Sequence, residues 1–272
     1  MLTTEQFDKA KQFIYRHGRL LERARFALHF ENGDTSQVLS ALECYQNADG
    51  GFGNGLELDI MCPASTPMCT EVALAIMADC GVGDPAVLEK CENWVLKSLT
   101  PEGSLPQPVE EIKKYPHGPW WAKPDDDRIY SIAGYLAKLG KGNADFFKAV
   151  TDNFIKRFTP FTYALKVYDY PLHIYLENSP HKEQLSVKFA SYDKAFTELL
   201  KKAAWHHPLF FCHDRWYNKR IDEQTWNDQA KAAISTLQDD GGVTIDEYAD
   251  LPWWRPVWTL EMLIRLKKQE LI

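Results

Sequence analysis

The stretch from Leu42 to Phe52 reads LECYQNADGGF and joins the end of an apolar helical pattern to a Gly-Gly pair. A similar stretch, ISTLQDDGGV, runs from Ile234 to Val243, and a weaker copy, LTPEGSL, runs from Leu99 to Leu105. Glycine adopts positive φ angles without steric cost, so a Gly-Gly pair can reverse the chain sharply after a helix. Because the turn recurs, the sequence predicts a fold built from repeated helical hairpins.

Apolar residues between these turns recur at intervals of three and four, which is typical of amphipathic helices. Asp84 predicts a helix start, because an aspartate caps a helix well and Pro85 suits its first position. Asn143 predicts another helix start in the same way. No segment shows the strict alternation of a half-buried strand. We therefore expect about ten or eleven helices and an all-α fold class.

Two kinds of helix are expected to alternate along the chain. The segments Glu71–Cys80 and Ser131–Leu139 are poor in charge, which indicates inner helices that are covered on most sides. The segments Pro85–Leu99 and Asp222–Leu237 carry a charged face, which indicates outer helices. Alternating inner and outer helices are what a ring of hairpins requires. We expect a single α/α-toroid domain over residues 1–272, with about five to six helical hairpins.

Charge and hydropathy limit the range of partners. The net charge of −7 argues against nonspecific binding of nucleic acid, which requires a basic face. No apolar run approaches the roughly 18–20 residues of a membrane-spanning helix, and the N-terminal stretch has no apolar signal core. We therefore expect a cytoplasmic protein without a membrane span. The six cysteines include no CxxC pair, and the oligomeric state stays open.

The residues from Tyr45 to Gly53 resemble the repeat of the prenyltransferase and squalene-cyclase superfamily, and the residues from Gly55 to Pro63 extend the similarity to short bacterial proteins with that repeat. Members of the superfamily include triterpene cyclases and the β-subunits of protein prenyltransferases. The resemblance implies a terpenoid cyclase-like or prenyltransferase-like toroid, with an aromatic-lined central cavity that binds or acts on an isoprenoid.

The catalytic motifs of that superfamily are not intact. The chain has neither the DxDD motif of class II terpene cyclases nor a DDxxD motif. Prenyltransferase β-subunits hold zinc with a D-x-C pair and a histidine, whereas Asp59 and Cys62 are separated by one residue more. No motif therefore predicts a cofactor, although zinc or magnesium stays open, for instance zinc shared by Asp59, Cys62 and His213. The segment His206–Trp216 has residue types that bind metals, without a recognised spacing.

Two groups of acids are candidate catalytic residues. Glu57 and Asp59 lie in the loop after the first Gly-Gly turn, and a desolvated carboxyl group there could act as a general acid. Asp125, Asp126 and Asp127 follow a long proline-rich loop of the kind that often forms a lid. Each group has an ordinary alternative, since loop carboxylates also accept backbone hydrogen bonds and acids at a helix start cap the helix.

Aromatic and cationic residues near these acids are candidates for substrate binding. Tryptophan faces can stabilise a carbocation or stack on a sugar, a guanidinium can hold a diphosphate, and a histidine on a helix can move protons. Packing within the repeat and ion pairing with neighbouring acids are the alternatives. The candidates are Trp120, Trp121, Arg128, Trp253, Trp254, Arg255 and His173.

Three hypotheses about function follow. The first is a terpenoid cyclase-like or prenyltransferase-like protein acting on or binding an isoprenoid. The second is a carbohydrate-active α/α-barrel enzyme that uses paired carboxylates. The third is a non-catalytic toroid that binds an apolar ligand or a protein. Mutation of the candidate acids distinguishes the third from the first two, because binding alone requires no acid.

Overall fold

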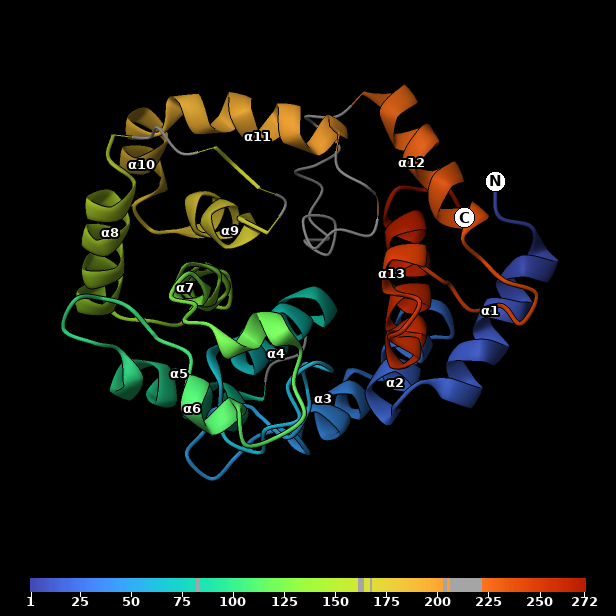
Figure 1. Cartoon of the computed structure of the whole chain (residues 1–272), viewed down its shortest axis with the longest axis horizontal. Helices are drawn as coiled ribbons and strands as arrows, with labels where there is room; N and C mark the ends of the chain where they lie inside the picture. Colours follow the sequence, from blue (N-terminus) through green and yellow to red (C-terminus); the bar gives the residue numbers. More distant parts are fainter. Residues whose placement is uncertain (82–83, 161–163, 167, 203–204, 206–221) are drawn as a thin grey trace. The chain divides into compact units, whose positions relative to one another are not determined.

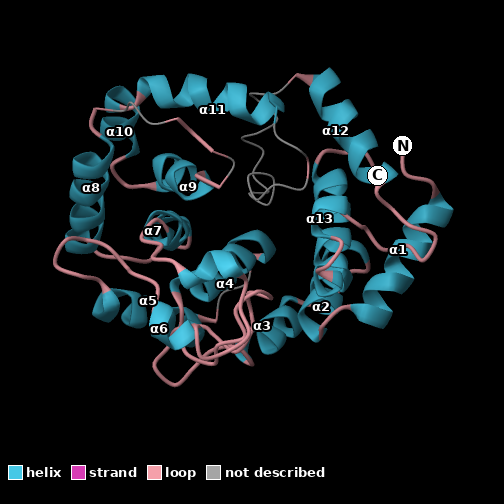
Figure 2. Ribbon diagram, viewed as in Figure 1, coloured by secondary structure: helices cyan, strands magenta, loops and turns pink. Residues whose placement is uncertain are grey.

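The computed structural model describes residues 1–81, 84–160, 164–166, 168–202, 205 and 222–272. Over these ranges the chain forms thirteen α-helices and no named strand, with only isolated β-bridges between loops (Figure 2). The predicted all-α class is therefore confirmed. None of the helices in these ranges combines the length and the apolar character that a bilayer crossing requires.

The described chain divides into two compact units. The terminal unit consists of Met1–Ala41 and Ala195–Ile272, and the middle unit consists of Leu42–Lys194. The boundaries fall within helix α3, Thr35–Glu43, and within helix α11, Ala190–Lys202. Each unit is described by itself below.

The middle unit has an inner row of helices in which α7 packs against α4 on one side and α9 on the other (Figure 1). Most residues of α4 and α7 are buried, whereas α5 and α8 bury one apolar face. This burial confirms the prediction that the two segments poor in charge are covered on most sides. The helices are α4 (Pro67–Cys80), α5 (Pro85–Ser98), α6 (Val109–Ile112), α7 (Arg128–Lys138), α8 (Ala144–Phe158), α9 (Tyr170–Asn178) and α10 (Lys182–Lys188), and the 3-10 helix η1 spans Pro119–Ala122.

Side-chain caps start the helices where the sequence predicts them. The carboxylate of Asp84 accepts a hydrogen bond from the backbone N–H of Ala86 at 2.6 Å, and the side chain of Asn143 accepts one from Phe146 at 2.8 Å. These bonds satisfy backbone donors that have no partner within the first turn of a helix. The two predicted helix starts are therefore confirmed.

The inner helices α7 and α9 approach each other closely at Gly134. A Cβ atom at this position would lie 2.7 Å from the carbonyl oxygen of Ile174. Next to this contact, the ring of Phe154 lies 5.1 Å from that of Tyr130 and 5.6 Å from that of Tyr175, measured between centroids. Helix α9 is therefore held between a small residue on α7 and an aromatic core shared with α8.

The terminal unit is organised around α13, which contacts α1 and α2. Its core includes Ile14, Phe26, Trp258 and Leu263. A buried ion pair joins Arg25 to Glu261, with Nη1 and Oε1 2.6 Å apart. The helices are α1 (Thr4–His17), α2 (Leu20–Phe30), α12 (Glu223–Ser235) and α13 (Arg255–Lys268), with the 3-10 helices η4 (Asp246–Tyr248) and η5 (Pro252–Trp254).

The hydroxyl group of Tyr15 predicts an alkaline loss of stability. It donates a hydrogen bond to Glu31 at 2.5 Å, and burial together with Glu31 raises the pKa of Tyr15 from 10.0 to about 12. The protonated phenol is thus favoured in the folded state, so its contribution is complete below pH 10 and is lost as the pH rises through about 12. We expect Tyr15→Phe to flatten the fall in unfolding free energy between these values in urea titrations. Tyr168→Phe, at an exposed site, should leave the slope unchanged, and an unchanged slope in Tyr15→Phe would contradict the assignment.

The first Gly-Gly turn is closed by backbone and carboxylate hydrogen bonds. The N–H of Asn47 donates to the carbonyl of Gly51, and the N–H of Gly50 donates to the carbonyl of Asn47, both at 2.9 Å. A carboxylate oxygen of Asp49 accepts from the N–H of Gly51 at 3.0 Å. The Asp-Gly-Gly sequence is therefore structural at this position, with Gly50 in the left-handed region at a φ of 98°.

The same backbone bonds recur in the turn Gln238–Gly242 and in the turn Thr100–Ser104. Aligning the two stretches on their shared glutamine would make Gln46 and Gln238 equivalent, and the structure corrects this pairing. The isolated bridges Gln46 to Phe52 and Leu237 to Val243 show that Leu237 occupies the position of Gln46. Gln46 instead has a specific role, because its amide donates to the carbonyl of Val87 at 2.9 Å and ties the turn to α5.

Candidate functional site

The candidate site lies where the starts of α4, α7 and α9 meet in the middle unit. Arg128 is the first residue of α7, and its Nη1 atom donates to the hydroxyl oxygen of Tyr170, the first residue of α9, at 2.6 Å. The same nitrogen donates to a carboxylate oxygen of Glu71 on α4 at 3.2 Å. The guanidinium also lies over the ring of Tyr170, 5.1 Å from its centroid. One buried arginine therefore links the three inner helices.

Carboxylates surround this arginine. The Nε atom of Arg128 donates to Asp125 at 3.1 Å, in addition to the contact with Glu71. Burial raises the pKa of Glu71, and the neighbouring Arg128 offsets that shift only in part. Burial alone would lower the pKa of Arg128, but Tyr170, Glu71 and Asp125 raise it well above its usual value. Arg128 therefore stays charged, with acidic partners already in place.

The three consecutive aspartates occupy three different environments. Asp125 pairs with Arg128 and also accepts the backbone N–H of Asp127 at 2.9 Å. Asp127 pairs with Arg157 at 2.8 Å, and burial raises its pKa while Arg157 lowers it. Asp126 is half-buried and forms no hydrogen bond within the described ranges, but its charge lies near enough to Arg157 to help raise the pKa of that arginine. Asp126 is thus the acid of the three whose side chain is not held by a hydrogen bond to another described residue.

Two loops of the middle unit are joined to each other by backbone hydrogen bonds. The N–H of Met61 donates to the carbonyl of Pro116 at 3.0 Å, and the N–H of Gly118 donates to the carbonyl of Asp59 at 2.8 Å. The loop that carries Asp59 and Glu57 is therefore fastened to the loop that leads to the tryptophans. Glu57 is buried near the start of α4, where burial and the charge of Glu57 raise the pKa of Cys69 to about 12.

The two tryptophans of η1 have different surroundings. The ring of Trp120 lies against Gly118, and 47% of the residue is exposed. Trp121 packs against an apolar cluster that includes Met68. The sulfur atom of Met68 lies 4.0 Å from Nη1 of Arg128, so Trp121 is one side chain away from the arginine. The structure thus joins Asp125 to Arg128 and Asp127 and links Trp121 to Arg128 through Met68, whereas Glu57, Asp59 and Trp120 lie in the two joined loops.

His173 lies one turn into α9 and is buried, together with Asp169. Asp169 immediately precedes the helix and accepts the backbone N–H of Lys166 at 2.6 Å. This bond shapes the entry to α9, which places Tyr170 against Arg128. The two residues thus belong to the same helix start as Tyr170.

The remaining predicted site residues belong to the terminal unit. Arg255 forms a double ion pair with Asp240 at 2.7 and 3.0 Å and donates to the carbonyl of Val243 at 3.1 Å. Trp253 is about half exposed, whereas Trp254 stacks on Trp258 with centroids 5.9 Å apart. The contacts of Arg255 fasten the second Gly-Gly turn to the start of α13, which is a structural role.

The sequence did not single out Glu71 or Tyr170 as site residues. Glu71 could have been recognised from the sequence, because it lies in a helix that is otherwise poor in charge. A glutamate buried in such a helix is expected to have a charged partner. Tyr170 had no such signal, because its partner Arg128 is 42 residues away along the chain. Both residues can be recognised as part of the site only from the structure, in which the inner helices lie side by side.

No metal site is apparent within either unit taken alone. Among the described residues of each unit, no three histidine, cysteine, aspartate or glutamate ligand atoms lie within 4.8 Å of one another. Cys62 is buried, and burial raises the pKa of its thiol. His213, the third member of the zinc site considered above, lies outside the described residues, as does the whole segment His206–Trp216.

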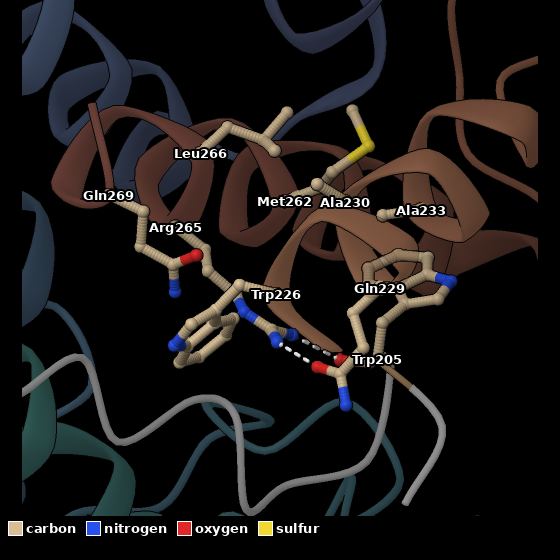
Figure 3. A pocket seen from close by; sticks show the side chains of 9 residues that line it. All are labelled: Trp205, Trp226, Gln229, Ala230, Ala233, Met262, Arg265, Leu266 and Gln269. Carbon is tan, nitrogen blue, oxygen red and sulfur yellow. Dashed lines mark hydrogen bonds between the residues drawn. The ribbon is translucent and has the colours of Figure 1, made fainter. Parts of the chain in front are cut away.

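A small pocket in the terminal unit is filled by its own side chains (Figure 3). Arg265 donates to the carbonyl of Trp205 and to the amide oxygen of Gln229, both at 2.7 Å, and its guanidinium lies over the ring of Trp226. The cavity volume of about 10 Å³ is comparable to the space of one water molecule. This pocket therefore has no room for a substrate-sized ligand.

Comparisons of the chain with models of protein families, with curated proteins and with solved structures give no match.

Proposed function

We propose that the protein is a terpenoid cyclase-like enzyme that acts on a neutral isoprenoid by acid–base chemistry. The reaction takes place at the acid cluster, which we define as Asp125, Asp126 and Asp127 together with Glu71 and Arg128. The proposal includes the fold, an α/α toroid of helical hairpins. It is supported by the resemblance of the Gly-Gly turns to the cyclase repeat and by the three turns that share the same hydrogen bonds.

The observation that carries the proposal is the separation of roles among three adjacent carboxylates. Asp125 is bonded to Arg128, Asp127 is paired with Arg157 and has a pKa raised by burial, and Asp126 has no hydrogen-bond partner among the described residues. Acid–base catalysis requires carboxyl groups whose environments move their pKa values apart. Asp127 in its protonated form transfers its proton to an alkene carbon, which creates a carbocation. Asp126 removes a proton from a neighbouring carbon, so the product is an isomer of the substrate.

The charges near the cluster favour a neutral substrate over a diphosphate. Arg128 and Arg255, the two arginines predicted to bind phosphate oxygens, are both engaged by carboxylates. The excess of acids around Arg128 would repel an anion but would stabilise positive charge that develops in a transition state. Aromatic faces such as that of Trp120 add to this stabilisation. Cyclase-type chemistry is therefore better supported than prenyl transfer.

A carbohydrate substrate is the second candidate. It is favoured by the half-exposed ring of Trp120, which is free to stack on a sugar, and by the open carboxylate of Asp126. The same acid would then protonate or activate a glycosidic bond. Substrate assays distinguish the two reactions, because their products differ in kind.

The test is incubation of the protein with farnesol, farnesene, farnesyl diphosphate and a set of oligosaccharides, followed by mass spectrometry of the products. We expect conversion of a neutral isoprenoid only, and a fall in kcat of about 100-fold in Asp126→Asn. The matched control is Asp145→Asn, which changes an exposed acid on α8 and should keep full activity. Cleavage of an oligosaccharide would favour the second candidate, and isoprenoid binding without turnover would assign a binding role.

A further inference from the structure

Gln107 is a buried amide beside the acid cluster. Only 6% of the residue is exposed, and both of its amide atoms are enclosed without a hydrogen-bond partner in the described structure. Its backbone N–H donates to the carbonyl of Asp125 at 3.3 Å, which fixes the residue next to the acids. The residue that carries the unpartnered amide is therefore bonded through its backbone to the segment that we propose to be catalytic.

The chain holds this amide in place by its local sequence. Gln107 stands between Pro106 and Pro108, and proline restricts both its own backbone and that of the residue before it. A second enclosed donor without a partner, the indole N–H of Trp121, belongs to η1, and η1 packs against α6, which begins two residues after Gln107. Enclosed polar groups without partners are rare in native proteins because each one lowers stability. Two side chains with such groups, Gln107 and Trp121, lie within fifteen residues of each other. This indicates that the groups have a function that offsets the loss of stability.

We propose that the Gln107 amide and the Trp121 indole N–H form a neutral polar subsite that binds a hydroxyl group of the substrate. This inference rests on the proposed function and narrows the substrate to an isoprenoid alcohol. A hydroxyl group both donates and accepts, which matches the two ends of an amide, and its oxygen can also accept from the indole. A hydrocarbon would leave the amide N–H, the amide oxygen and the indole N–H unpaired. A diphosphate would place negative charge beside the acids.

Replacement of Gln107 by leucine separates the binding role from a structural role. In Gln107→Leu the unpartnered groups disappear with little change of shape, so we expect the Tm of the free protein to rise by about 2–4 °C. Affinity for farnesol, measured by isothermal titration calorimetry, should fall about 10-fold, while affinity for farnesene stays unchanged. Trp121→Phe, which removes the N–H donor, should weaken farnesol binding in the same selective way. The control Gln184→Leu, at an exposed site on α10, should change neither quantity.

Three other outcomes would overturn the inference, and each has a different cause. A lower Tm in Gln107→Leu would mean that the amide has a structural partner. An unchanged preference for farnesol over farnesene in Gln107→Leu and Trp121→Phe would remove the subsite but leave the proposed function in place. If the wild-type protein binds neither farnesol nor farnesene, the proposed function fails and the inference fails with it.

Discussion

Replacing Gly50 with alanine is expected to destabilise the middle unit by at least about 3 kcal/mol. The φ of Gly50 is 98°, a conformation that costs a residue with a side chain about 1–2 kcal/mol. A Cβ atom there would also lie 2.2 Å from the carbonyl oxygen of Lys90 in α5, which is backbone and cannot turn away. The two effects add, because relief of the clash would require the turn to move away from α5.

Gly140 provides the matched control for this prediction. Its φ is 70°, and a Cβ atom built on it would meet no atom within 4 Å. Gly140→Ala should therefore lose only about 1 kcal/mol. The measurement is the free energy of unfolding from urea titrations of the two variants and the wild-type protein. Equal losses in both variants would show that the contact with α5 does not matter.

The close approach of Gly50 recurs in the other two turns. A Cβ atom on Gly103 would lie 2.4 Å from the carbonyl oxygen of Ala149 in α8, and one on Gly241 would lie 2.3 Å from that of Lys9 in α1. Each of the three turns thus presses a glycine with positive φ against the backbone of another helix. The repeat visible in the sequence is therefore a repeat of packing as well as of turn geometry.

The helices and turns of this protein were predictable because their signals are local. The capping residues Asp84 and Asn143 act within one helical turn, and the hydrogen bonds of the Asp-Gly-Gly turn span four or five residues. Matching Gln238 with Gln46 gives the wrong register for the second turn. The backbone hydrogen bonds of Gln238 correspond to those of Asn47, and not to those of Gln46. The sequence also gave no sign that the turn glycines contact distant helices, since the partner helix is not encoded near the turn.

The candidate site was predictable only in part, for a related reason. The sequence singled out Asp125, Asp126 and Asp127 because three acids beside tryptophans are conspicuous. It could not assign different roles to them, because those roles depend on Arg157 and on burial. It also offered Arg128 as a phosphate ligand. The structure instead surrounds this arginine with carboxylates, and the consequence for stability can be tested directly.

Arg128→Met is expected to destabilise the middle unit by about 3–5 kcal/mol, the usual result of removing one partner from a buried ion pair. The loss arises because Glu71 and Asp125 keep their negative charges, and because the hydroxyl of Tyr170 loses its donor. The double variant Arg128→Met with Glu71→Leu should be more stable than the single variant, since it removes the buried charge together with its partner. The control is Lys148→Met, which breaks the exposed pair with Asp152 and should have little effect.

The pH dependence of Arg128→Met identifies the cause of the loss. Burial already raises the pKa of Glu71 above its ordinary value of 4.5, and removal of the guanidinium should raise it further. A carboxyl group with a raised pKa in the folded state favours folding below its unfolded pKa, and this contribution is lost as the pH rises through the folded value. The variant should therefore regain stability as the pH is lowered from 7 toward 4.5, whereas the double variant should not. If the deficit of the single variant is independent of pH, the loss comes from packing of the arginine side chain and not from the uncompensated charge of Glu71.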